Sequence, residues 1–198
     1  MPAEPTRDRI FAAARSAFAA EGMEGLSMRK VAKAVGITPM AIYRHFADRD
    51  ALVDALAIDG LDRWRDRIAA IDVGDPIAWL EQMGEEFLDY ALEEPRRFEA
   101  AFLLPARSAR KFPEDFAAGR SPPGQIWLAK LEDARVQGAL KPDTNPLDVG
   151  LAVWGMGQGL ITLWRAGRIT GGLEDFRRLY RQSLRRCIGA FVTRDFHP

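Results

Sequence analysis

Side chains that suit phosphate binding are concentrated between Ser27 and Arg49. This stretch holds five cations (Arg29, Lys30, Lys33, Arg44 and Arg49) and one acid, Asp48, although the whole chain has zero net charge. Hydroxyl, guanidinium and imidazole groups donate readily to phosphate oxygens, and apolar side chains can contact a base methyl group. The candidate donors are Arg29, Thr38, Tyr43, Arg44 and His45, and the apolar candidates are Pro39 and Met40.

Two short helices are predicted to position these side chains. Ser27 is a good N-cap for a helix that stops at Gly36. Thr38 is a cap followed by proline at the first position of the next helix. Helices this short are unstable alone, so we expect them to pack on the amphipathic segment 6–20. Three helices joined by such a tight turn are typical of a helix-turn-helix, whose last helix enters the major groove of DNA.

A three-helix bundle without any DNA contact is the alternative interpretation of this segment. Ile42 and Phe46 are expected to face the core of the bundle in either case. Met40 could be core or could touch a base, and the sequence leaves both open. Tyr43 and His45 are better candidates for contact, because polar rings on so short a helix would otherwise only be solvated.

The rest of the chain is also predicted to be helical. Nearly every interval between prolines and glycines has an apolar period near 3.6, without sustained alternation, so we expect an all-α fold of about nine helices and no sheet. Residues 1–49 should form the domain with the helix-turn-helix (about 27–46), and a helix at about 50–69 should link it to a C-terminal domain, 50–198. The later helices are expected at about 75–93, 95–104, 124–137, 146–166 and 173–193, with a helical turn at 114–118.

The N-terminal sequence resembles the TetR family of transcriptional regulators over residues 6–57, without a gap. The resemblance rests on Gly25-Leu26-Ser27, Val31-Ala32, Val35-Gly36, Tyr43-Arg44-His45-Phe46, and Arg49 followed by Leu52. It implies a homodimer that binds a palindromic operator in double-stranded DNA, most often as a repressor. The positions that match the family's DNA contacts are Ser27, Arg29, Thr38, Pro39, Met40, Tyr43, His45 and Arg49. Many members have lysine where this chain has Arg49, which keeps the positive charge.

The family resemblance also implies a C-terminal domain that dimerises and binds a small effector. Aromatic residues are frequent there, which favours an apolar or aromatic effector, although an ordinary core explains most of them equally well. The candidate pocket residues are Phe87, Tyr90, Phe102, Trp127, Trp154 and Gln158. The candidate dimer residues are Gly155 and Gly159, which would form a groove for a partner backbone, and Leu179, Ser183, Cys187 and Phe191 on the last helix.

Other classes of protein have little support in the sequence. One cysteine and two histidines offer no metal cluster, and no nucleophile elbow or phosphate-binding loop is present, so we expect no enzyme activity, catalytic residue, metal or cofactor. The glycines at 155, 157 and 159 follow no strand and lack nucleotide-loop spacing. No stretch has the length of a membrane span, and the start of the chain lacks an apolar leader, which predicts a cytoplasmic protein. The segment 75–94 carries seven acids and no base, so a basic N-terminal segment should precede a neutral or acidic remainder.

Overall fold

The computed structural model describes residues 6–193 and confirms the all-α fold class. This part of the chain contains ten α-helices and a short 3-10 helix, and its only extended pairing is an isolated bridge between Leu140 and Val192. The chain folds into two compact units. Unit 1 comprises residues 1–62 and 94–109, and unit 2 comprises residues 63–93 and 110–198.

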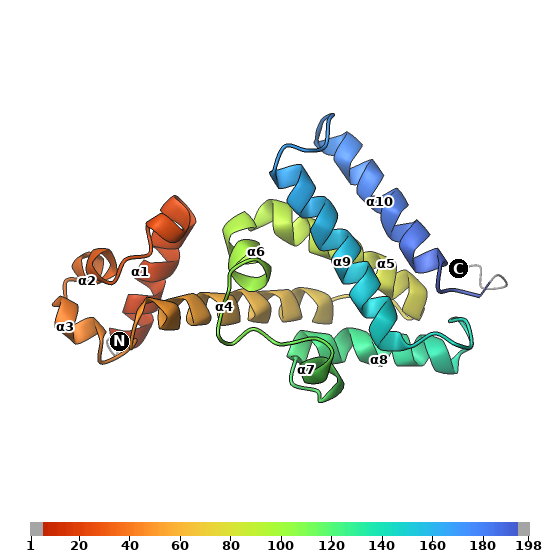
Figure 1. The fold of residues 1–198 in the computed structure, drawn as a ribbon, viewed down its shortest axis with the longest axis horizontal. Helices are drawn as coiled ribbons and strands as arrows, with labels where there is room; N and C mark the ends of the chain where they lie inside the picture. The colour runs from red at the N-terminus through yellow and green to blue at the C-terminus, as the bar shows by residue number, and fades with distance from the viewer. Residues whose placement is uncertain (1–5, 194–198) are drawn as a thin grey trace. The chain divides into compact units, whose positions relative to one another are not determined.

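Unit 1 is built on α1 (Thr6–Glu21), the 3-10 helix η1 (Gly22–Glu24), α2 (Met28–Val35), α3 (Pro39–Ile42), the first part of α4 (Arg49–Ala69) and α6 (Pro95–Phe102). Figure 1 shows α2 and α3 as two short helices beside α1. Their apolar faces form one core with α4 and α6, in which Ile42 and Phe46 are buried as predicted. Its members include Ile10, Phe18, Leu26, Val31, Ile42, Phe46, Leu52, Leu56 and Ala100.

The tight turn between α2 and α3 has clear local causes. Gly36 adopts a φ of +76°, a left-handed conformation that a side chain would disfavour. This lets the backbone N–H of Ile37 donate to the carbonyl of Ala32 at 3.0 Å. Thr38 then caps α3, since its Oγ1 accepts from the N–H of Ala41 at 3.2 Å. The capping signals in the sequence therefore predict this turn correctly.

Unit 1 also contains a segment that is distant in sequence, residues 94–109. Arg97 donates to Asp59 of α4 at 2.7 Å. The backbone N–H and the hydroxyl of Ser108 donate to Asp54 of the same helix, at 3.0 and 3.2 Å. Gly60 lets the backbones approach closely, because a Cβ there would lie 2.7 Å from the carbonyl oxygen of Arg97. The sequence predicts a boundary at residue 49, and it gives no indication of this returning segment.

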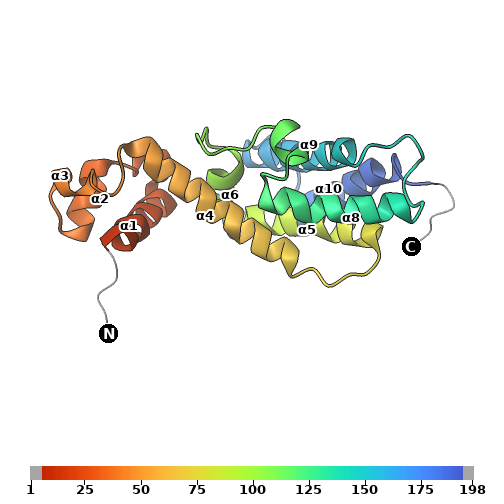
Figure 2. The same ribbon diagram turned by 90° about the horizontal axis from the view of Figure 1, so that it is seen from below.

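Unit 2 consists of the end of α4, α5 (Pro76–Glu93), α7 (Glu114–Ala117), α8 (Pro122–Val136), α9 (Pro146–Arg165) and α10 (Leu173–Gly189). Figure 2 shows α8, α9 and α10 as neighbouring long helices, and α5 contacts all three. Within the described part of the chain, no helix is long and apolar enough to cross a membrane. The core of unit 2 includes Trp79, Leu80, Leu88, Phe176, Tyr180, Leu184 and Ile188.

Glycines allow the helices of unit 2 to pack closely. A Cβ at Gly150 would lie 2.1 Å from the indole of Trp127, and one at Gly84 would lie 2.5 Å from Leu184. The hydroxyl of Tyr180 donates to the carbonyl of Gly84 at 3.0 Å. Burial of this phenol raises its pKa well above its ordinary value. Tyr180 is therefore a neutral, hydrogen-bonded part of the core.

The acids of α5 are matched by arginines of α10. Arg177 pairs with Asp89 at 2.6 Å, Arg181 with Glu85 at 2.9 Å, and Arg185 with Glu81 at 3.3 Å. Members of each set are four residues apart, so they follow one face of each helix. Three acids of the acidic segment noted in the sequence are thus locally neutralised.

The last helix ends earlier than the sequence predicts. Its apolar period continues to about Thr193, but α10 stops at Gly189. The chain then turns toward the loop before α9, where the N–H of Lys141 donates to the carbonyl of Phe191 at 2.9 Å. The N–H of Thr193 donates to the carbonyl of Ala139 at 3.0 Å. These hydrogen bonds to a segment some 50 residues away replace the last helical turn.

Candidate nucleic-acid interface

The surface of α3 and the turn after it presents the predicted donors to solvent. Met40 is 73% exposed and Tyr43 is 50% exposed, so Met40 does not belong to the core. Thr38, Pro39, Arg44 and His45 are exposed as well. The helix itself is shorter than expected, because Tyr43, Arg44 and His45 lie in a turn closed by the bond from the N–H of His45 to the carbonyl of Ile42, 3.0 Å long. Phe46, buried in the core, anchors that turn.

The second helix adds cations to the same unit, and they differ in their surroundings. Arg29 and Lys33 are exposed, and neither has an ion-pair partner among the described residues. Lys30 lies between them and is paired with Glu21 at 2.7 Å. Ser27 is the N-cap residue of α2, but its hydroxyl makes no capping bond to its own helix. Arg29, Lys33 and the hydroxyl of Ser27 are thus available to an external partner.

Arg49 has an internal role that the sequence does not reveal. Its Nε donates to the carbonyl of Leu26 at 2.8 Å, and its Nη2 donates to the carbonyl of Met23. Both acceptors belong to the chain just before α2. Arg49 therefore ties the start of α4 to the start of the helix-turn-helix through two of its five N–H donors.

A small charged cluster surrounds the N-terminus of α4. Asp48 caps the helix by accepting from the N–H of Ala51 at 2.8 Å. Arg107 donates to Asp48 at 3.1 Å and to Asp50 at 2.6 Å. The bond from Ala51 first, and then the Arg107 guanidinium, lower the pKa of Asp48 below its ordinary value. The returning segment thus stabilises the ionised cap of α4.

In unit 2 the predicted pocket residues form two aromatic groups. Trp64 contacts Phe87 with ring centroids 5.3 Å apart, and it stacks on Tyr90 at 6.1 Å. Phe116 of α7 contacts Trp127 and Trp154, each at 5.9 Å.

Phe102 is the predicted pocket residue that falls outside unit 2. It belongs to unit 1, where its ring packs on Phe98 with the centroids 5.0 Å apart. Phe102 is thus assigned to the same compact unit as the helix-turn-helix.

Gln158 is a polar exception on α9. Its Oε1 is buried and has no hydrogen-bond partner within the described residues. It lies one helical turn from Trp154, so the two side chains share a face of α9. A buried acceptor without a donor is unfavourable, and such groups are rare in folded proteins.

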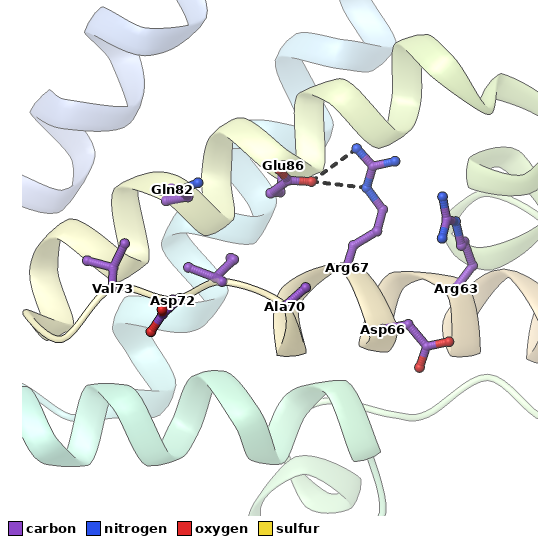
Figure 3. Close-up of a pocket in the computed structure, with 9 residues that line it drawn as sticks. Arg63, Asp66, Arg67, Ala70, Asp72, Val73, Gln82 and Glu86 are labelled. Atoms are coloured by element: carbon purple, nitrogen blue, oxygen red, sulfur yellow. Dashed lines mark hydrogen bonds and ion pairs between the residues drawn. The ribbon is translucent and has the colours of Figure 1, made fainter.

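A surface hollow of about 500 Å³ lies between the end of α4, the loop after it and α5 (Figure 3). Arg67, only 11% exposed, donates to Glu86 at 3.1 Å and to Glu93 at 2.9 Å. Burial would lower the pKa of Arg67, but the bonds to these carboxylates raise it overall. The sequence does not single out these residues, and their charges already satisfy one another. The ion pairs of Arg67 with Glu86 and Glu93 therefore hold the end of α4 against α5.

The predicted dimer residues lie along an open edge of α9 and α10. A Cβ at Gly155 or Gly159 would meet nothing within 4 Å, and both glycines are exposed. On α10, Leu179 is exposed and Ser183 and Cys187 are half-buried, as is Phe191 just beyond the end of the helix. Partial burial raises the pKa of the Cys187 thiol. Four other residues of this helix are buried in unit 2, namely Phe176, Tyr180, Leu184 and Ile188.

Comparison with known proteins agrees with this architecture. Residues 10–56 match the model of bacterial regulatory proteins of the tetR family, and residues 80–187 match a tetracyclin repressor-like C-terminal domain. The chain therefore belongs to the TetR family of DNA-binding transcriptional regulators. No group of three or more metal-ligating side chains occurs among residues 6–193.

Individual relatives are similar over nearly their whole length. The HTH-type transcriptional regulator UidR of Escherichia coli (strain K12) is 28% identical, over 96% of this chain and 95% of that protein. The HTH-type transcriptional repressor AcnR of Corynebacterium efficiens is 27% identical, over 91% and 93%. Among solved structures, a TetR variant from Acinetobacter baumannii AYE, in complex with minocycline, covers 91% of this chain and 93% of its own, with a TM-score of 0.65 and 19% identity.

Proposed function

We propose that this regulator is a repressor that binds a palindromic operator as a homodimer and leaves it when a small effector binds unit 2. The exposed surface of α3 and the turn after it carries the proposal. It presents Tyr43, Arg44 and His45 to solvent, while Ile42 and Phe46 of the same segment hold it on the core. Ser27, Arg29, Thr38, Pro39 and Met40 complete the proposed contact surface. Arg49 contributes by positioning the helix-turn-helix, with a phosphate contact as a secondary role.

The DNA-binding proposal is tested by selecting bound sequences from random double-stranded DNA and measuring affinity for the selected site. Affinity should fall steeply with salt, because cations that bind phosphates release counterions. Tyr43→Ala and Arg29→Ala should abolish specific binding with almost no change in melting temperature. Lys30→Ala, beside Arg29 but already paired with Glu21, is the matched control and should retain most of the affinity. Binding that does not depend on salt would contradict the proposal.

The homodimer is proposed to form through the open edge of α9 and α10. Besides Gly155 and Gly159, this edge exposes Leu151, Leu163 and Leu179, and exposed leucines on adjacent helices are typical of an association surface. The small glycines would let a partner helix approach closely, and Ser183, Cys187 and Phe191 would flank the contact. Two copies related by a two-fold axis match a palindromic operator. A monomer at micromolar concentration in light scattering would refute this arrangement.

The effector is proposed to be a small apolar or aromatic molecule that also carries a hydrogen-bond donor. The rings of Phe87, Tyr90, Trp127 and Trp154 would supply the apolar contacts. Gln158 would supply the acceptor, since its buried Oε1 has no partner among the described residues. Gln158→Leu should therefore raise the stability of the effector-free protein by about 1–3 kcal/mol and weaken the response to effector. Loss of stability with an unchanged response would show that Gln158 is structural.

Release is proposed to be a population shift between two dimer conformations. In the effector-bound conformation, the two copies of α4 would hold the helix-turn-helix segments too far apart for successive major grooves, which are about 34 Å apart. Such coupling is reciprocal. Effector should lower operator affinity by the same factor by which operator lowers effector affinity, and unequal factors would contradict the mechanism.

A further inference from the structure

A cation outside the helix-turn-helix lies next to its exposed surface. Arg7, in the first turn of α1, is exposed, and its guanidinium carbon lies 5.0 Å from the ring centroid of Phe46. Phe46 directly follows His45 at the end of the turn after α3. The residue is only 3% exposed and anchors this turn in the core of unit 1. The contact between Arg7 and Phe46 therefore brings the start of α1 to the end of the segment that carries Tyr43, Arg44 and His45.

Most other cations of unit 1 are committed to partners within the protein. Arg9 donates to the carbonyl of Val35 at 2.9 Å, and Arg15 pairs with Asp59 at 3.5 Å. Lys30 is paired with Glu21, and Arg49 is bonded to two backbone carbonyls. Within α1, α2 and the α3 turn, the described cations with neither a carboxylate nor a carbonyl partner are Arg7, Arg29, Lys33 and Arg44.

Stacking on Phe46 suits Arg7 for binding an anion. A guanidinium that lies over an aromatic ring is held in place by the cation–π attraction, and it keeps the N–H donors along its edge for a phosphate. Asp8 is its neighbour in sequence, but successive residues of a helix point about 100° apart. The contact with Phe46 therefore positions the guanidinium of Arg7 before a phosphate binds.

We propose that the first turn of α1 belongs to the DNA-contacting surface, and that Arg7 binds a backbone phosphate beside the groove in which α3 lies. This inference rests on the proposed operator binding and extends the contact surface beyond the helix-turn-helix. A phosphate contact carries no sequence information. Arg7 should therefore strengthen binding to the operator and to its base-substituted variants by the same factor.

The test compares Arg7→Ala with Arg15→Ala in the full-length protein, using the selected operator over a range of salt concentrations. Arg15 is a matched control on the same helix, since its guanidinium also lies near a ring, 5.9 Å from the centroid of Phe11. Each lost phosphate contact should reduce the slope of log affinity against log salt by about 0.9, so two subunits should lose about 1.8. If the salt-independent part of binding is unchanged, affinity at 0.1 M salt should fall roughly 60-fold. Arg15→Ala should leave both the slope and the affinity close to wild type.

The variant Arg7→Lys separates folding from contact. It keeps the charge and should retain most of the slope, and all three variants should melt within a few degrees of wild type. An unchanged slope in Arg7→Ala, or equal losses in Arg7→Ala and Arg15→Ala, would overturn the inference while leaving operator binding by the wild type intact. Absence of salt-dependent operator binding by the wild type would instead reject the proposed function, and the inference with it.

Discussion

Gly150→Ala is expected to destabilise unit 2, although an alanine is normally favoured over a glycine inside a helix. The change should gain about 1 kcal/mol of helix propensity. The new Cβ, however, would lie 2.1, 2.4 and 2.8 Å from three carbons of the Trp127 indole. Trp127 is buried and rigid, so the indole or the backbone of α9 must shift, at a cost of about 1–3 kcal/mol. With a clash this close we expect a cost at the upper end, and a net loss of about 1–2 kcal/mol.

Tryptophan fluorescence provides a selective assay for this effect. All five tryptophans of the chain lie at or beyond residue 64, and hence in unit 2. Urea unfolding followed by fluorescence therefore reports on unit 2, whereas circular dichroism reports on both units. The midpoint of the fluorescence transition should fall in Gly150→Ala, with little change in its slope.

Two further variants make the prediction strict. Gly155→Ala lies on the same helix, but its Cβ would meet nothing within 4 Å, so it should not lower the stability of the subunit. In the background of Trp127→Leu, Gly150→Ala should lose most of its cost, because the clashing ring is absent. If Gly150→Ala stabilises unit 2 as an ordinary helical substitution does, the close packing of α8 on α9 is refuted.

Three other outcomes follow from the structure. Arg49→Ala should destabilise unit 1 by about 1–2 kcal/mol through the loss of its bonds to the carbonyls of Leu26 and Met23; Arg49→Lys should not restore it, and an unchanged melting temperature in both variants would be inconsistent with this role. The pKa of Asp48 is lower in the folded protein than its ordinary value of 3.8, so its ionised cap stabilises unit 1 above about pH 4, and this stabilisation is lost as the pH falls through the folded pKa. Asp48→Asn should therefore show a smaller loss of stability between pH 5 and pH 3 than wild type, measured by circular dichroism, and equal losses would argue against the cap. Gly155→Leu should shift the protein toward monomer in sedimentation velocity without lowering subunit stability, and a fully dimeric variant would exclude Gly155 from the interface.

Local signals in the sequence were sufficient for most of the secondary structure. Gly36 and Thr38 act within a few residues of their own positions, so their types predict where α2 ends and α3 begins. The exposed character of Tyr43, Arg44 and His45 is also local, because it depends only on Ile42 and Phe46 facing inward. These features are recoverable from a single sequence for that reason.

The features that the sequence did not predict depend on distant partners. Nothing near Thr193 shows that the last turn of α10 is replaced by bonds to Ala139 and Lys141. Likewise, the inward direction of Arg49 depends on carbonyls more than 20 residues away. The placement of Phe102 in unit 1 depends on α6 packing there. A periodic pattern reports that a face is apolar, but it does not report which neighbour covers it.

The interrupted course of the chain limits how this protein can be divided or recombined. The chain passes between the two units within α4, again after residue 93 and again after residue 109. A fragment that ends at residue 62 would keep the helix-turn-helix but would lack Ala100, which is buried in its core, and the bonds that Ser108 and Arg97 donate to Asp54 and Asp59. A chimaera that joins this helix-turn-helix to another C-terminal domain must therefore include residues 94–109 as well. Unit 2, in turn, cannot be exchanged as one continuous cassette.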